Sequence, residues 1–203
     1  MQVLRLAMVA GVLSVATLDA SVIAFVSGDG VGEGNSLTAA NVVITPDPSW
    51  QPPTNGAQWI SYEDTGDSGS RPPAAPAAIA SFFEIIDVPA PLTGSLTAWA
   101  DDTVDVYLNG VKLISAAAPV AAPHCTVDVI TCRPDGGATL SLTANLLPGV
   151  NTIRFDAYQY FNGPFGILYY GSITATDTPE PGTWLLSGCG LLGLGAFLSR
   201  RRS

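Results

Sequence analysis

Short runs of β-branched and aromatic residues, separated by turn-forming residues, fill the chain between residues 21 and 177. About eleven such runs can be counted, and no long helical pattern interrupts them. The chain of 203 residues contains 21 glycines and 16 prolines, which supply the turns between the runs. The pattern therefore predicts a single all-β domain, an antiparallel β-sandwich, over residues 25–177.

Two turn sequences indicate antiparallel pairing. Asn109-Gly110 lies between two apolar runs, and both residue types accept the positive φ of a type I′ hairpin turn. Pro148-Gly149 suits the two central positions of a type II turn. Before the first turn, Val104, Val106 and Leu108 alternate with polar residues, as in a strand with one buried face.

Three segments within residues 81–176 resemble the core of galactose-binding-like jelly rolls, which include carbohydrate-binding and PA14-type modules. They are "LTAWADDTVDVYLNGVKL", "LLPGVNTIRFDA" and "GPFGILYYGSI". The shared features are an Asp-Asp turn, a strand ending in Tyr-x-Asn-Gly, and a late strand entered through Leu-x-Pro-Gly-x-Asn. The resemblance implies a jelly-roll fold, and it carries over no binding residue.

The first 24 residues have the organisation of a signal peptide. Arg5 is followed by an uncharged apolar stretch and then by small residues where signal peptidase could cut. Cuts after Ala16, Ala20 or Ala24 remain open, although a cut after Ala20 places Leu18 at a position that favours small residues. The alternative is a buried first strand.

Residues 178–203 combine an apolar run with a basic end. Seventeen uncharged residues, 183–199, would form a helix of roughly 25 Å, just long enough to cross a bilayer. Arg200, Arg201 and Arg202 follow, and the positive-inside rule would hold them at the cytoplasmic side as a membrane stop. The preceding domain would then lie outside the cytoplasm.

The same segment resembles the PEP-CTERM sorting signal of Gram-negative bacteria, through Pro179-Glu180-Pro181, the Leu- and Gly-rich run and the terminal arginines. In that family a membrane protease, the exosortase, is thought to recognise the triplet and to release or transfer the preceding domain. The resemblance implies exosortase and signal peptidase as processing partners, with an inner-membrane intermediate before delivery to the cell surface or extracellular matrix. An ordinary tail anchor with a chance Pro-Glu-Pro is the alternative.

The charge of the central region argues against nucleic acid as a partner. Between residues 21 and 177 there are four basic and fifteen acidic residues. An acidic surface suits an exported domain, and it leaves open a role for divalent cations. No cofactor is required by any motif, but structural calcium is an option at Asp101, Asp102 and Asp105, or at Asp29 and Glu33.

Catalytic chemistry has little support in the sequence. His124 is the one histidine, and it lies in a Pro- and Ala-rich stretch with no nucleophile motif nearby, so we expect a non-enzymatic protein. Two acidic residues could still approach each other as in a glycan hydrolase. Cys125 and Cys132 are predicted to form a disulfide on the oxidising side of the membrane, whereas Cys189 is expected to stay unpaired.

Aromatic residues supply the remaining candidate site, because a ring can stack on the apolar face of a sugar. Within "AYQYFNGPFG", the residues Tyr160, Phe161 and Asn162 are expected at the tip of an exposed loop. The sequence thus predicts a surface or matrix protein that is structural or binds carbohydrate, in an exopolysaccharide or biofilm matrix. A permanently membrane-tethered adhesin and a surface glycan hydrolase are the alternatives.

Overall fold

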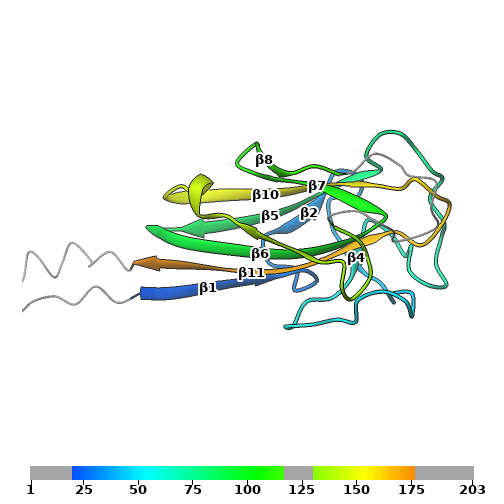
Figure 1. Ribbon diagram of the computed structural model, residues 1–203, viewed down its shortest axis with the longest axis horizontal. Coiled ribbons are helices and arrows are strands. Elements are labelled where there is room, and N and C mark those ends of the chain that lie inside the picture. The colour runs from blue at the N-terminus through cyan, green and yellow to red at the C-terminus, as the bar shows by residue number, and fades with distance from the viewer. Residues whose placement is uncertain (1–19, 117–129, 177–203) are drawn as a thin grey trace, which may run out of the picture. The chain divides into compact units, whose positions relative to one another are not determined.

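The structure is a computed structural model, and it describes residues 20–116 and 130–176. These residues form two antiparallel sheets that face each other, as the sequence predicts (Figure 1). Most of the predicted signal peptide and the predicted transmembrane segment, 183–199, lie outside the described residues. Within the described ranges, no helix is long and apolar enough to cross a membrane.

Sheet A is built around its longest strand pair, in the order β3-β4-β11-β6-β9, and β1 also pairs with β11. Its strands are β1 (Ala20–Val26), β3 (Val42–Val43), β4 (Ile60–Ser61), β6 (Pro91–Asp101), β9 (Ala138–Ser141) and β11 (Gly166–Thr176). The first and last described residues, Ala20 and Thr176, are paired at one end of this sheet. Asp101 pairs with Gly166 at the other end.

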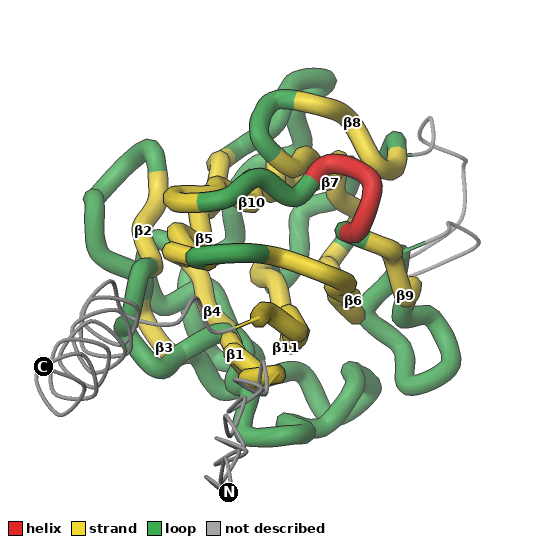
Figure 2. The backbone as a smooth tube through the Cα atoms, turned by 90° about the vertical axis from the view of Figure 1, so that its left-hand side faces the viewer, coloured by secondary structure: helices red, strands yellow, loops and turns green. Residues whose placement is uncertain are grey.

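Sheet B has the order β2-β5-β10-β7-β8, again with antiparallel neighbours throughout the described part of the chain. Its strands are β2 (Glu33–Asn35), β5 (Ala80–Val88), β7 (Thr103–Leu108), β8 (Val111–Ile114) and β10 (Gly149–Tyr158). A short 3-10 helix, Thr143–Asn145, precedes β10. Figure 2 shows the strands of the two sheets as two layers.

The hydrophobic core lies between the sheets. Alternate residues of each long strand point into the core. In β10, every second residue from Asn151 to Ala157 is therefore buried. Phe155 of sheet B and Tyr169 of sheet A stack across the core with ring centroids 4.5 Å apart. Full burial of large side chains from both layers provides the main stabilisation of the domain.

The predicted Asn109-Gly110 turn is confirmed by its backbone angles, and Gly149 of the second predicted turn has a positive φ at the start of β10. Asn109 and Gly110 have φ values of 52° and 82°, and the type I′ turn requires both to be positive. The Asn109 amide donates hydrogen bonds to the Asn145 carbonyl and to the Asn151 side chain, which ties the hairpin to the loop before β10. Gly149 has a φ of 87°, as the second central residue of a type II turn requires.

One boundary differs from the sequence prediction. The predicted domain begins at residue 25, but β1 begins at Ala20 and pairs with β11 from its first residue. Residues 20–24, which a cut after Ala24 would remove, are therefore part of sheet A.

Candidate functional site

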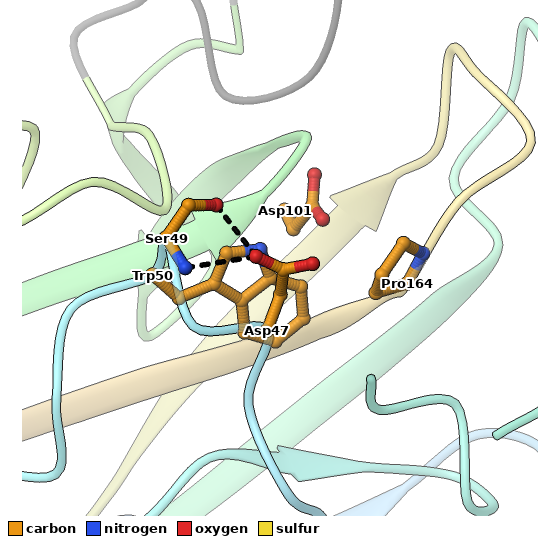
Figure 3. Close-up of a pocket in the computed structure, with 5 residues that line it drawn as sticks. All are labelled: Asp47, Ser49, Trp50, Asp101 and Pro164. Atoms are coloured by element: carbon orange, nitrogen blue, oxygen red, sulfur yellow. Dashed lines mark hydrogen bonds between the residues drawn. The ribbon is translucent and has the colours of Figure 1, made fainter. Parts of the chain in front are cut away.

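A small pocket lies at the end of sheet A where β6 ends and β11 begins. Its volume is about 140 Å³, and Figure 3 shows its five lining residues: Asp47, Ser49, Trp50, Asp101 and Pro164. At roughly 30 Å³ for each water molecule, this space holds a few water-sized groups. It is therefore large enough for part of one small polar molecule.

Asp101, the last residue of β6, is the most unusual group in this pocket. It is 1% exposed, and neither of its carboxylate oxygens has a hydrogen-bond partner of normal geometry among the described residues. Burial raises the pKa of Asp101 well above its usual value, the neighbouring carboxyls of Asp102 and Asp47 raise it further, and a hydrogen bond from the Trp50 side chain acts in the opposite direction. The Trp50 side chain is thus a nearby donor, but among the described residues neither Asp101 oxygen has a hydrogen bond of good geometry.

The wall opposite Asp101 is held by a tight turn in "PDPSW". Asp47 Oδ1 accepts hydrogen bonds from the backbone N–H of Ser49 at 2.8 Å and from its hydroxyl at 2.7 Å. The Trp50 ring then packs against Trp59 in a tilted arrangement, with ring centroids 4.3 Å apart and an angle of 42° between the ring planes. This packing buries Trp50 to 3% exposure, so its ring forms a wall of the pocket and is not an open stacking platform.

Asp102 positions the aromatic loop that follows β10. Its Oδ2 accepts hydrogen bonds from the backbone N–H groups of Tyr160 at 2.6 Å and Phe161 at 3.1 Å. The peptide bond between Asp101 and Asp102 is cis. Because the second Asp102 oxygen, Oδ1, is buried without a partner in the described structure, it adds a third unsatisfied acceptor to this end of the sandwich.

The predicted sugar-contacting residues lie in this aromatic loop. Tyr160 and Phe161 are half-buried, Asn162 is exposed, and the Asn162 side chain accepts a hydrogen bond from the backbone N–H of Ala74 at 2.9 Å. The Tyr160 ring stacks on Tyr158 at 5.9 Å. Only Asn162 is thus displayed as fully as the sequence analysis expected.

Asp105 does not join Asp101 and Asp102. Its carboxylate lies 2.7 Å from the Lys112 ammonium and also accepts hydrogen bonds from the hydroxyls of Tyr107 and Tyr158. Burial raises the pKa of Asp105, but the hydrogen bond from Lys112 and further hydrogen bonds outweigh it, so the pKa is lowered overall. Across residues 20–116 and 130–176, no three acidic, histidine or cysteine side chains are grouped to hold a metal ion.

The second predicted calcium pair is occupied by the backbone. Glu33 accepts hydrogen bonds from the N–H groups of Gly28 at 2.7 Å and Gly30 at 3.2 Å, and Asp29 accepts one from Val31. These bonds fold the glycine-rich loop before β2.

Beneath the same loop lies a buried cluster that the sequence analysis missed. The Tyr169 hydroxyl lies 3.0 Å from Glu33 Oε1 and 2.8 Å from Glu84 Oε2. Burial, partly offset by the Tyr169 hydrogen bond and reinforced by the charges of Glu33 and Asp29, raises the pKa of Glu84 to about 8. An acidic residue in the otherwise apolar "SFFEIIDV" run is the signal that could have identified it.

The remaining predicted sites are only partly within the described structure. Cys132 is fully buried and belongs to the cluster of apolar residues around Trp59 and Trp99. Its predicted partner Cys125 lies outside the described residues, as do His124 and Cys189, so the disulfide stays a prediction. The sorting triplet Pro179-Glu180-Pro181 and the three terminal arginines also lie outside them.

Comparison with family models nevertheless settles the nature of the C-terminal segment, because residues 177–202 match the PEP-CTERM protein-sorting motif. The chain ends in a PEP-CTERM sorting signal. This motif indicates export, sorting to the cell surface of a Gram-negative bacterium and processing by an exosortase. No curated protein matches the chain.

The chain is similar to several solved structures at low sequence identity. A family 35 carbohydrate-binding module from Clostridium thermocellum is 14% identical, with a TM-score of 0.42 over 75% of this chain and 97% of that chain. The family 35 module from Paenibacillus barcinonensis is 13% identical, with a TM-score of 0.38 over 77% and 99%. An α-L-rhamnosidase from Streptomyces avermitilis is 19% identical, with a TM-score of 0.42 over 69% of this chain and 14% of that one.

Proposed function

We propose that this PEP-CTERM protein is a non-enzymatic component of an extracellular matrix, and that its pocket at Asp101 binds one sugar unit of a polysaccharide. The observation that carries the proposal is the pair of buried Asp101 oxygens, which have no hydrogen bond of good geometry among the described residues. A buried unsatisfied acceptor is costly, and a ligand rich in hydroxyl groups supplies the missing donors. The Ser49 hydroxyl and the Trp50 wall add a polar contact and an apolar surface.

The charge of the pocket narrows the class of sugar. Asp47 and Asp101 both line it, and a sugar that carries a carboxylate or a sulfate would bring a second negative charge close to Asp47 and is disfavoured. A neutral or amino sugar is favoured for the same reason. The volume of about 140 Å³ suits the edge of one ring and not a stretch of several sugars, so the ligand is a chain end or a branch.

The position of the pocket supports a role at a surface. Asp101 pairs with Gly166 at the start of β11, whereas the chain leaves β11 towards the sorting motif after Thr176, at the other end of the same strand. An eleven-residue strand is about 33 Å long. The pocket is thus separated from the point at which the sorting segment leaves the domain.

Calcium forms a second part of the proposal. The oxygens of Asp101 and the free Oδ1 of Asp102 are the hard ligands that calcium prefers, and a bound ion would remove the need to protonate Asp101. Asp105 would not take part, because Lys112 already neutralises it.

The experiment measures retention of the exported protein on the exopolysaccharide of its own cells, with calcium and with a chelator. We expect Asp101→Asn to reduce retention at least tenfold, and Asp87→Asn, which changes an exposed carboxylate on β5, to leave it unchanged. Retention that is unaffected by Asp101→Asn would rule out the pocket. Release of the parent protein by the chelator would show that calcium is needed for retention. Retention in the presence of the chelator would show that the sugar contacts hold the protein without calcium.

A further inference from the structure

The position of strand β1 is relevant to where signal peptidase cuts the exported chain. Three cuts are open from the sequence, after Ala16, Ala20 or Ala24, although the cut after Ala20 places Leu18 at a position that favours small residues. The third of these lies inside β1, which spans Ala20–Val26. The structure can therefore distinguish cuts that keep the strand from a cut that removes most of it.

The inward side chains of β1 are part of the core. Phe25 is 4% exposed, and Ile23 packs against the same core cluster. The Phe25 ring occupies the space next to Gly171, where an added Cβ would lie 2.1 Å from the ring. Val22 and Ala24 point outward and are exposed, so the strand shows the alternation of a half-buried edge strand.

The backbone of β1 also covers one side of β11. Seven residue pairs join the two strands, from Ala20 with Thr176 to Val26 with Tyr170. The other strand on this side, β4, pairs with β11 only at Ile167. Loss of residues 20–24 would leave β11 without its β1 partner from Ser172 to Thr176, and exposed edges of this kind promote aggregation.

A cut after Ala24 would also place a charge in an unfavourable position. Phe25 would become the first residue, and its new ammonium group would lie where the strand faces Gly171. Its ring is nearly fully buried, so the charge would be held at the margin of the core without a carboxylate partner in the β1–β11 register.

We propose that signal peptidase cuts after Ala16 or after Ala20 and not after Ala24, so that the mature protein keeps β1. Hydrolysis adds one water across the Ala16–Thr17 or Ala20–Ser21 peptide bond, which leaves a carboxyl terminus on the signal peptide and an amino terminus on the mature chain. A start at Ser21 loses only the Ala20–Thr176 pair. The inference rests on export, which is part of the proposed function, and does not depend on the ligand.

The test is N-terminal sequencing and intact-mass analysis of the exported protein. A first residue of Thr17 or Ser21 supports the proposal, and a first residue of Phe25, or any other start after Ser21, overturns it. An uncut chain that begins at Met1 overturns both this proposal and export through a cleaved signal peptide. The exported protein with a start at Thr17 or Ser21 but without polysaccharide retention would contradict only the proposed ligand.

Two pairs of variants test the physical reasoning. Ala24→Leu should not change the mature N-terminus, because Ala24 is exposed and is not the cleavage residue, whereas Ala16→Leu with Ala20→Leu should accumulate the precursor. In the second pair, one heterologous signal peptide is fused before Ser21 or before Phe25 of the otherwise full chain. We expect a several-fold lower yield of exported folded protein from the Phe25 fusion, because destabilised chains are degraded. Equal yields and equal melting temperatures would overturn the requirement for β1.

Discussion

The buried Glu84 and its half-buried neighbour Glu33 lead to a specific prediction about the pH dependence of stability. Both carboxyls lie within hydrogen-bond distance of the Tyr169 hydroxyl, which carries a single proton. If Glu84 is protonated, it donates to Tyr169 and Tyr169 donates to Glu33, so every group is satisfied. The substitution Glu84→Gln keeps this arrangement, since an amide N–H replaces the carboxyl proton, and it removes the titration.

The sign and size of the effect follow from the pKa of Glu84. Burial first, with the nearby Glu33 and Asp29 charges added, raises it from 4.5 to about 8, so the folded protein holds a proton that the unfolded chain releases. This contribution is fully present below pH 4.5 and is lost as the pH rises towards 8. The upper limit for a shift of about 3.5 pH units is roughly 5 kcal/mol, and we expect about 2 kcal/mol because the loop above Glu84 can admit water.

The assay is urea denaturation of the mature exported protein and of the Glu84→Gln variant between pH 5 and pH 9. The two should have similar free energies of unfolding at pH 5, and the variant should be more stable at pH 9 by about 2 kcal/mol. Asp87→Asn, an exposed substitution on the same strand, is the control and should follow the parent protein. Parallel pH profiles for Glu84→Gln and the parent would refute the assignment of a raised pKa to this group.

Two further substitutions test the packing. Asn109→Ala should lower the free energy of unfolding by about 2–3 kcal/mol, measured by urea denaturation, because the Asn109 side chain makes three hydrogen bonds and Ala disfavours a positive φ. The control is Asn55→Ala, since Asn55 has a φ of 52° in an exposed turn. An equal loss of stability in the two variants would contradict the role of the hydrogen bonds. Gly171→Ala should cost more than 2 kcal/mol in the same assay, because its Cβ would overlap the Phe25 ring, and a loss below 0.5 kcal/mol would show that β1 yields easily.

The turns and strands could be predicted because the signals for them are local. Asn109 and Gly110 accept a positive φ wherever they occur, and the alternation of Val104, Val106 and Leu108 marks a buried face without knowledge of the partner strand. The start of the domain was set too late, at residue 25. The apolar residues of β1 fit both a strand buried in a sheet and the end of a signal peptide, so the sequence pattern alone does not distinguish the two.

The candidate pocket could be predicted only in part. Asp101 and Asp102 were identified because they are adjacent, but Asp105 was grouped with them on sequence distance alone. Asp101 ends β6 of sheet A, whereas Asp105 belongs to β7 of sheet B, where it alternates with the core residues Val104 and Val106 and pairs with Lys112. Asp47 and Trp50 come from a distant turn, and only the pairing of β6 with β11 and the packing of that turn bring them to Asp101.

The sequence by itself determined the sorting signal, the antiparallel β class and the hairpin turns, because each depends on residues that are close neighbours in the chain. The tertiary structure decided which carboxylates are left unsatisfied, which are neutralised and which are protonated. The cause is burial together with long-range strand pairing, which places Asp101 in a pocket, Asp105 beside Lys112 and Glu84 beneath Tyr169. The same pairing makes residues 20–24 part of the fold, which is why we propose cleavage no later than Ala20.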